Sequence, residues 1–231
     1  MKYETWKKIY EDIANDLNLD KNQDEIASEI FDNLICQNLK TYVSLDTFFN
    51  LIKNRTVFVF GAAPSLESDI KNNIHQFQQS VLITADGATS ALLKYDIVPD
   101  IIITDLDGII SDQLRANEKK AILVIHAHAD NINIIQQTIP RINGSYLGTV
   151  QTNPSSYNYV KNFGGFTDGD RSVFFAAYFH AKKIILAGFD CKNKAGFYSF
   201  QKNKNQLLKQ KKLQWCQHLL NRFPDTYLTH I

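Results

Sequence analysis

Between residues 56 and 187 the chain alternates short runs of β-branched or aromatic residues with longer stretches of helical character. The apolar runs are TVFVF, SVLIT, DIIIT and AILVIHA, followed by residues 145–150 and 184–187. Apolar runs of this length predict strands buried on both faces, and the helical stretches between them predict crossover connections. The sequence therefore predicts an α/β fold, with a mostly parallel sheet flanked by helices.

The first 54 residues have a different, helical pattern. Apolar residues recur there three or four positions apart: Trp6, Tyr10, Ile13, Leu17, Ile26, Ile30 and Leu34. This spacing predicts two helices, and residues 45–52 are expected to form a third, with Ser44 as its cap. We expect a helical N-terminal segment, residues 1–54, that packs on an α/β catalytic domain, residues 55–231, and supplies no catalytic group.

Three further expectations concern the connections. Residues 171–183 are expected to form a helix, and residues 202–223 a final amphipathic helix. The segment between DIIIT and AILVIHA is expected to be a short connection.

The composition is that of a stable globular protein. Of the 231 residues, 44% are hydrophobic and 21% charged, which provides a core and excludes intrinsic disorder. Lys and Arg number 25 and Asp and Glu 24, a net charge of +1, so no general field attracts nucleic acid or an anionic membrane. Cys36, Cys191 and Cys216 form no CxxC pair, and no apolar run approaches the roughly 20 residues that span a bilayer. We therefore expect a cytoplasmic protein with no membrane segment.

Small and polar residues stand at the carboxyl ends of four predicted strands. The four segments are GAAPSL (61–66), ADGA (85–88), DLDG (105–108) and HAHADN (126–131). Because ligands of open parallel sheets bind outside the carboxyl ends of the strands, we expect a binding site where these segments converge.

Asp105 and Asp107 are the sharpest candidates among them. Residues two apart in an extended segment project to the same side, roughly 6–7 Å apart, so the two carboxylates can share a metal ion. Oxygen ligands favour Mg²⁺, which takes one or two carboxylates and completes its shell with water and phosphate oxygens. The alternative is that Asp105 caps the following turn and that Asp107 and Gly108 are turn residues alone.

His126 and His128 also fall on one side of an extended segment, with Asp130 continuing the series. The HxHxD pattern fits a transition-metal site. The imidazoles can equally donate hydrogen bonds to phosphate, orient a leaving group, or belong to an ordinary hydrogen-bonded strand end.

Two loops are candidates for anion binding. The Gly61 loop passes from strand to helix, with Pro64 suited to the first helical turn, so its backbone N–H groups can cradle phosphate or carboxylate. It is neither a P-loop nor a GxGxxG motif, and an ordinary strand-to-helix turn explains it as well. The second loop, GGFTDGDRS (164–172), carries Arg171, which can bind phosphate through two N–H groups. A mobile loop that ends in a helix cap is the alternative.

Taken in order, these motifs resemble a known family. The motifs are GxxPSLE, TADGA, PDIIITDLDG, HAHxDN, GFTDGDR and LAGFD, and they cover residues 58–190. In this order they resemble the archaeal 6-hydroxymethyl-7,8-dihydropterin diphosphokinases, which are similar in their core to thiamine diphosphokinases. The sequence departs from the family pattern at Ala63 and Ala129, where glycine is usual, and each change adds one methyl group.

The resemblance implies a Rossmann-like three-layer core and an activity. That activity is Mg²⁺-dependent transfer of a diphosphoryl group from ATP to the pterin hydroxymethyl oxygen, with AMP released, in folate- or methanopterin-type cofactor synthesis. The expected metal ligands are Asp86, Asp105, Asp107 and Asp130. The expected catalytic residues are Asp105, Asp107, His126 and His128. The residues expected to bind ATP or the pterin are Gly61, Ser65, Asp86, Gly87, Asn131, Thr167, Asp168, Asp170, Arg171 and Ser172.

Two rival functions stay open beside this one. A thiamine diphosphokinase shares the ADG and DxD themes, but it is expected to have GDFDS where this chain has TDLDG. A non-catalytic nucleotide or sugar-nucleotide binding module would bind its ligand and form no AMP. ATP and a small pterin are the expected partners, nucleic acid is not, and a homodimer stays open as the assembly.

Overall fold

The computed structural model describes residues 1–190, 196–199 and 206–231. Its strands are β1 (Thr56–Phe60), β2 (Val81–Ala85), β3 (Ile101–Thr104), β4 (Ile122–Ala127), β5 (Tyr146–Val150), β6 (Lys183–Ala187) and β7 (Leu228–His230). Its α-helices are α1 (Tyr3–Leu17), α2 (Lys21–Cys36), α3 (Leu45–Ile52), α4 (Leu66–Asn73), α5 (Ala88–Lys94), α6 (Ile110–Glu118), α7 (Ile132–Thr138), α8 (Asp168–Tyr178) and α9 (Gln206–Leu220). Short 3₁₀ turns follow α2, α4, α7 and β5.

The strands within these ranges form one sheet in the order β5-β4-β3-β2-β1-β6-β7. Every neighbouring pair is parallel. The chain builds outward from β1 to β5 and then returns to the other side of β1 with β6, so the strand order reverses at β1. This arrangement confirms the predicted parallel α/β fold, and the reversal creates a crevice of the kind that holds ligands in such sheets.

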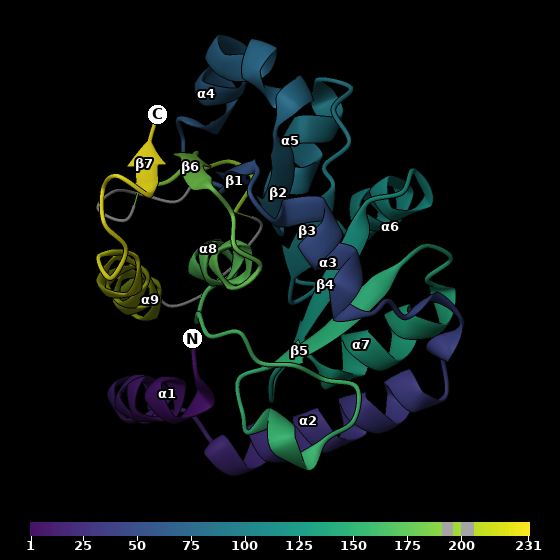
Figure 1. Ribbon diagram of the computed structural model, residues 1–231. Coiled ribbons are helices and arrows are strands. Elements are labelled where there is room, and N and C mark those ends of the chain that lie inside the picture. The colour runs from purple at the N-terminus through teal and green to yellow at the C-terminus, as the bar shows by residue number, and fades with distance from the viewer. Residues whose placement is uncertain (191–195, 200–205) are drawn as a thin grey trace.

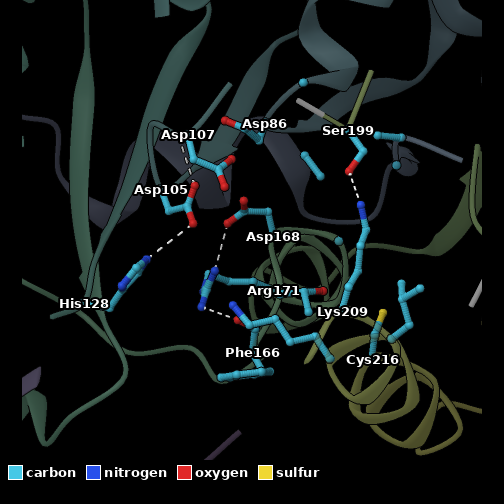
Figure 2. Close-up of a pocket in the computed structure, with 18 of the residues that line it drawn as sticks. Asp86, Asp105, Asp107, His128, Phe166, Asp168, Arg171, Ser199, Lys209 and Cys216 are labelled. Atoms are coloured by element: carbon cyan, nitrogen blue, oxygen red, sulfur yellow. Dashed lines mark hydrogen bonds and ion pairs between the residues drawn. The ribbon is translucent and has the colours of Figure 1, made fainter. Parts of the chain in front are cut away.

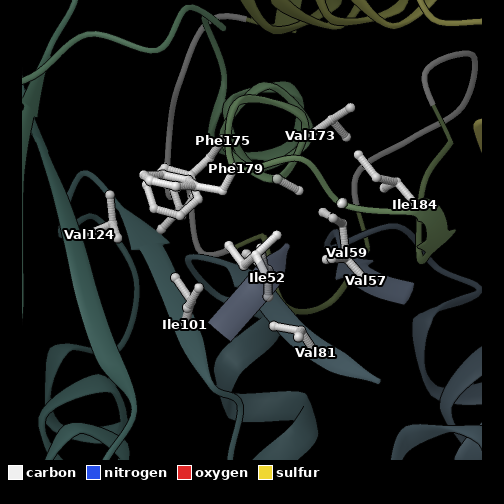
Figure 3. Close-up of a cluster of buried hydrophobic side chains, with 14 of the residues drawn as sticks. Ile52, Val57, Val59, Val81, Ile101, Val124, Val173, Phe175, Phe179 and Ile184 are labelled. Carbon is white, nitrogen blue, oxygen red and sulfur yellow. The ribbon is translucent and has the colours of Figure 1, made fainter. Parts of the chain in front are cut away.

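Helices cover both faces of the sheet, as Figure 1 shows. Successive side chains of a strand point to opposite faces, so Val57 and Val59 of β1 pack with Phe48 of α3 and Phe175 of α8. Figure 3 shows this cluster beneath the α8 helix. On the other face Phe58 packs with residues of α4 and α5. Two apolar layers therefore hold the sheet rigidly between the helices.

The N-terminal segment is helical, as expected. Trp6 and Ile13 of α1 are fully buried in a cluster that also contains Phe174 of α8 and Leu219 of α9. Phe31 of α2 packs against the other side of the sheet with residues of β4 and β5. Among the helices in the described ranges, none has the length and apolar character needed to cross a bilayer.

Several boundaries differ from the sequence-based expectations. The segment before β4, expected to be a short connection, contains the helix α6. The buried residues of α6 are Gln113, Ala116 and Asn117, and because two of them are polar, the sequence shows no apolar stripe that would predict a helix. The helix expected at residues 171–183 runs instead from Asp168 to Tyr178, because Thr167 and Asp170 form a capping box that starts it before the apolar run. Strand β7 was not anticipated. The final helix is assigned from Gln206 to Leu220, and positions 202–205 of its expected range lie outside the described residues.

Candidate active site

A pocket of about 520 Å³ opens at the carboxyl ends of the strands. The loops after β1, β2, β3 and β4 form its floor, and the first turn of α8 forms one side. Residues at the α1–α2 junction, on α9, and at positions 151, 188–190 and 198–199 also line it. The convergence of strand ends expected from the sequence is therefore present, and it lies inside a cavity.

Three carboxylates meet in this pocket. Asp86 follows β2, Asp105 follows β3 and Asp168 begins α8, and one oxygen of each lies within 4.8 Å of the others. Figure 2 shows the three side chains pointing toward one another, with Asp107 beside them. Clustered carboxylate oxygens are the ligands that Mg²⁺ prefers, so this donor set fits a hard divalent cation.

Asp86 is fixed by its surroundings. Its Oδ1 accepts hydrogen bonds from Thr104 Oγ1 (2.7 Å), Gln113 Nε2 (2.7 Å) and the Gly108 N–H (3.3 Å). A Cβ atom at Gly108 would lie 2.4 Å from Asp86 Oδ2, so only glycine lets the DLDG turn come this close. The backbone of Asp86 itself has a φ of 40°, a left-handed conformation that a surrounding structure must hold in place.

Asp105 lies between the pocket and the loop after β4. His128 Nε2 is 3.4 Å from its Oδ2, and its backbone carbonyl accepts from Asn131 Nδ2 at 2.8 Å. The same Asn131 amide also donates to the His126 carbonyl at 2.7 Å. Asn131 therefore ties the ends of β3 and β4 together from a buried position outside the pocket lining.

The electrostatics of the carboxylates push their pKa values apart. Burial, followed by the charges of Asp107 and Asp105, raises the pKa of Asp86 to about 7. Burial opposes ionisation of Asp105 as well, but the hydrogen bond and charge of His128 outweigh it and lower its pKa to about 2. Burial, then the negative charge of Asp105, raises the pKa of Asp168 well above its usual value. A bound cation would relieve this mutual repulsion.

The first turn of α8 presents Asp168 and Arg171 to the pocket. Arg171 donates to Asp168 Oδ1 at 2.9 Å and to the Phe166 carbonyl at 2.8 Å. Gly165 has a φ of 87°, and a Cβ there would lie 2.4 Å from the Arg171 Cα, so this turn requires glycine. The loop is therefore an ordered support that holds a guanidinium beside the carboxylates.

With this geometry in place, similarity to known proteins decides the family. Residues 33–196 match the family model described as 6-hydroxymethylpterin diphosphokinase MptE-like. The chain belongs to this family. Membership confirms the resemblance drawn from the motifs and the expectation of an enzyme of the transferase class.

Three curated relatives carry the name 6-hydroxymethyl-7,8-dihydropterin pyrophosphokinase. The Pyrococcus furiosus protein is 42% identical over 86% of this chain and 82% of its own length. The Methanocaldococcus jannaschii protein is 37% identical over 97% of both chains, and the Methanothermobacter thermautotrophicus protein is 35% identical over 96% of this chain and 94% of its own. Among solved structures, the MAf glycosyltransferase from Magnetospirillum magneticum AMB-1 aligns with a TM-score of 0.51 at 14% identity, over 80% of this chain and 35% of that one. That last likeness concerns the fold alone.

Most of the residues singled out from the sequence line the pocket. They are Gly61, Asp86, Gly87, Asp105, Asp107, His128, Asp130, Thr167, Asp168 and Arg171. Within this group the three clustered carboxylates include Asp168, which the motifs suggested as a binding residue, while Asp107 and Asp130 lie outside the cluster. Asp130 is exposed at the pocket rim.

Five of the expected residues lie outside the pocket lining in the described parts of the chain, namely Asn131, whose contacts are given above, and four others. His126 is 2% exposed, and its Nδ1 lies 3.1 Å from Thr149 Oγ1; burial lowers its pKa well below the usual value, so the ring is neutral. The other three support local structure. Ser65 donates to Asp69 at 2.9 Å, Asp170 accepts from the Thr167 N–H at 2.8 Å, and Ser172 donates to the Asp168 carbonyl at 2.6 Å.

Both departures from the family pattern lie at the pocket. The Ala63 N–H donates to the Gly188 carbonyl at 2.8 Å, and the Ala129 N–H donates to Asp24 Oδ1 at 2.8 Å. Each alanine lines the cavity while its amide holds a protein contact. Both loops therefore keep these backbone hydrogen bonds with alanine at the two positions.

Sequence reasoning missed the residues that arrive from distant helices. The pocket is also lined by Gln23 and Asp24 of α2, by Gln151 after β5, and by Lys209 and Lys212 of α9. Nothing in their local sequence marks them, because charged residues on an amphipathic helix ordinarily face solvent. The N-terminal segment thus contributes directly to the pocket wall.

Proposed function

We propose that this chain transfers the diphosphoryl group of ATP to the hydroxymethyl oxygen of 6-hydroxymethyl-7,8-dihydropterin and releases AMP. The observation that carries the proposal is the group of Asp86, Asp105 and Asp168 within the pocket, in a member of a family whose curated relatives are named for this chemistry. The pocket volume of about 520 Å³ falls in the range of roughly 300–1,000 Å³ common for small-molecule sites.

The donor set suits such a transfer. Moving a phosphoryl-type group requires alignment of donor and acceptor oxygens and neutralisation of charge, rather than a covalent protein intermediate. Asp86, Asp105 and Asp168 would hold Mg²⁺, and a bound Mg²⁺ supplies positive charge to the phosphate oxygens. Arg171, held by Asp168 and Phe166, places a further positive charge at the same end of the pocket.

His128 is the side chain best placed to assist the acceptor. It lines the pocket and its Nε2 faces Asp105 at 3.4 Å, whereas His126 is buried behind the cavity. His128 Nδ1 accepts from the Asp130 N–H at 3.3 Å, so Nε2 is the nitrogen that would take up the proton of the substrate hydroxyl, in place of its contact with Asp105. We assign this role to His128 and none to His126.

The proposal extends to the setting of the reaction. We propose Mg²⁺ as the metal, the cytoplasm as the compartment, and folate- or methanopterin-type pterin cofactor synthesis as the purpose. Thiamine is the rival acceptor, since it also offers a primary hydroxyl, and the TDLDG segment in place of GDFDS argues against it.

The test is a direct product analysis with the full chain. Incubation with ATP, Mg²⁺ and 6-hydroxymethyl-7,8-dihydropterin, followed by chromatography with mass detection, is expected to give AMP and diphosphorylated pterin in equal amounts. A parallel reaction with chelator is expected to give neither. ADP as the stoichiometric product would indicate an ordinary kinase, and ligand binding without any product would indicate a binding module. A higher kcat/KM for thiamine in direct competition would overturn the choice of acceptor.

A further inference from the structure

The wall of the pocket opposite the carboxylates is formed by α9. Lys209, Lys212, Leu213 and Cys216 of this helix line the cavity. Figure 2 shows Lys209 and Cys216 on the side of the pocket away from Asp105 and His128. These residues lie beyond residues 33–196, the part of the chain that matches the family model, so this wall is not part of the matched core.

The spacing of these residues makes α9 a two-sided helix. Positions three, four and seven apart share one face, which places Lys209, Lys212 and Leu213 together toward the cavity. The neighbouring Lys211 faces elsewhere, because its Nζ pairs with Asp16 of α1 at 2.6 Å. Lys211 thus serves the packing of α9 on α1, whereas Lys212 faces the pocket.

Lys212 is a partly buried cation without an anionic partner. Its Nζ lies 5.8 Å from the centre of the Phe166 ring, and in residues 1–190, 196–199 and 206–231 it forms no hydrogen bond or ion pair. Phe166 in turn accepts from Arg171 through its carbonyl. Lys212 therefore stands near the Arg171 side of the site, and Lys209, which donates to Ser199 Oγ at 2.9 Å, stands one turn away.

The pocket thus holds two kinds of charge. The clustered carboxylates of Asp86, Asp105 and Asp168 suit a divalent cation, and the ammonium groups that α9 adds to the lining suit an anion. A metal-bound polyphosphate satisfies both at once, because its oxygens bind the cation at one end and extend negative charge toward the other. A neutral planar acceptor carries no negative charge and therefore cannot bind both the cation and the ammonium groups.

From this arrangement we propose that Lys212, with Lys209 beside it, binds the phosphate chain of the nucleotide substrate and orients it from the carboxylates toward α9. The inference rests on the proposed function for the identity of the nucleotide. The binding of a polyphosphate by these lysines is a separate property of the pocket and can be measured without turnover.

The test compares four variants of the full chain: Lys212→Met, Lys212→Arg, Lys209→Met and the matched control Lys211→Met. Methionine keeps the apolar stem and removes the charge. Isothermal titration with tripolyphosphate, and with the unreactive analogue α,β-methylene-ATP, both in excess Mg²⁺, gives the affinities. We expect Lys212→Met to weaken binding by about tenfold or more, the size of one charge-assisted hydrogen bond. Lys209→Met is expected to lose less, while Lys212→Arg and Lys211→Met stay near the wild-type affinity.

Steady-state kinetics separates nucleotide binding from a general loss of structure. Lys212→Met is expected to raise KM for ATP and leave KM for the pterin unchanged, whereas a misfolded site would change both. Equal tripolyphosphate affinity in wild type and Lys212→Met, absence of binding to the wild type, or an equal loss in Lys211→Met would each overturn the inference. If the wild type binds tripolyphosphate through Lys212 yet forms no AMP, the proposed function fails and the inference stands. If it forms AMP and Lys212→Met keeps its KM for ATP, the reverse holds.

Discussion

Replacement of Asp24 by alanine should destabilise the fold and the catalytic loop together. Asp24 belongs to α2, is 3% exposed, and accepts hydrogen bonds from the Ala129 N–H at 2.8 Å and from Gln151 Nε2 at 2.6 Å. The Tyr10 hydroxyl of α1 donates to the same carboxylate. One buried side chain thus joins α1 and α2 to the loop after β4 and to the end of β5.

The expected magnitude follows from these contacts. A hydrogen bond to a charged group contributes about 1.5–3 kcal/mol net, and each buried donor left unpaired costs about 1–3 kcal/mol. The contributions overlap, because the Tyr10 hydroxyl can rotate toward another acceptor, so Asp24→Ala should lower the free energy of unfolding by about 3–5 kcal/mol. Tyr10→Phe removes one donor and strands no buried group, and should cost about 1 kcal/mol.

Urea unfolding of the full chain, followed by circular dichroism, measures both values. Because Ala129 lies between His128 and Asp130, the turnover of Asp24→Ala under stabilising conditions should also fall. Asp24→Asn keeps one acceptor oxygen, so its turnover should lie between those of the wild type and Asp24→Ala. A loss smaller than about 1 kcal/mol for Asp24→Ala, or an equal loss for Tyr10→Phe, would refute the idea that this carboxylate holds the N-terminal helices to the site.

Three other predictions concern the carboxylates. Asp105→Asn should lower turnover at saturating Mg²⁺ by about 100-fold or more with near-normal unfolding, and a near wild-type rate would remove that side chain from the metal site. Asp107→Asn, outside the cluster of three carboxylates, should lower turnover less. Gly108→Ala places a Cβ 2.4 Å from Asp86 Oδ2, so the turn must shift, and calorimetry should show Mg²⁺ affinity reduced by about tenfold, whereas unchanged affinity would mean that the turn yields freely. Burial and the neighbouring charges raise the pKa of Asp86 from 3.8 to about 7, so between these values the folded state binds more protons than the unfolded state and the metal-free protein loses stability as pH rises. Mg²⁺ should therefore raise Tm more at about pH 8 than at about pH 5, and equal shifts would contradict a role for Asp86.

The parts of the site that follow strands could be predicted from the sequence. Strand periodicity is local, and the rule that ligands lie beyond the carboxyl ends of parallel strands converts it into a position in space. Asp86 and Asp105 were found in this way. The strand bounds also separate the two histidines: β4 continues to Ala127, so His126 is still inside the sheet beside Thr149, while His128 has passed the strand end and lines the pocket.

The remaining parts depend on tertiary packing, which leaves no local signal. Asp168 joins the carboxylates because the capping box of Thr167 and Asp170 starts α8 ahead of its apolar run, and the sequence suggested a loop there. Asp24 and Lys212 come from helices that are separated from the strand-end motifs in sequence. Their charges have the same pattern as a solvated helix face, and only the packing of α1 on α9 and of α2 on the sheet turns them inward.

This division of the pocket bears on how an acceptor is chosen. The carboxylate cluster alone favours a cation, and the thiazolium ring of thiamine would be drawn to it more strongly than a neutral pterin. Once Mg²⁺ occupies the cluster and the phosphate chain lies along α9, that attraction is largely neutralised, and selection falls to hydrogen bonds with the amide and amine edge of the ring. Sites built to pair such groups can reject an analogue that lacks them by about 10⁴-fold. Gln23 of α2 reaches the pocket from outside the strand-end motifs and can take part in this pairing, whereas the Gln151 amide already donates to Asp24 at 2.6 Å. We therefore expect the strand-end core to provide the chemistry of transfer and the surrounding walls to provide the choice of acceptor.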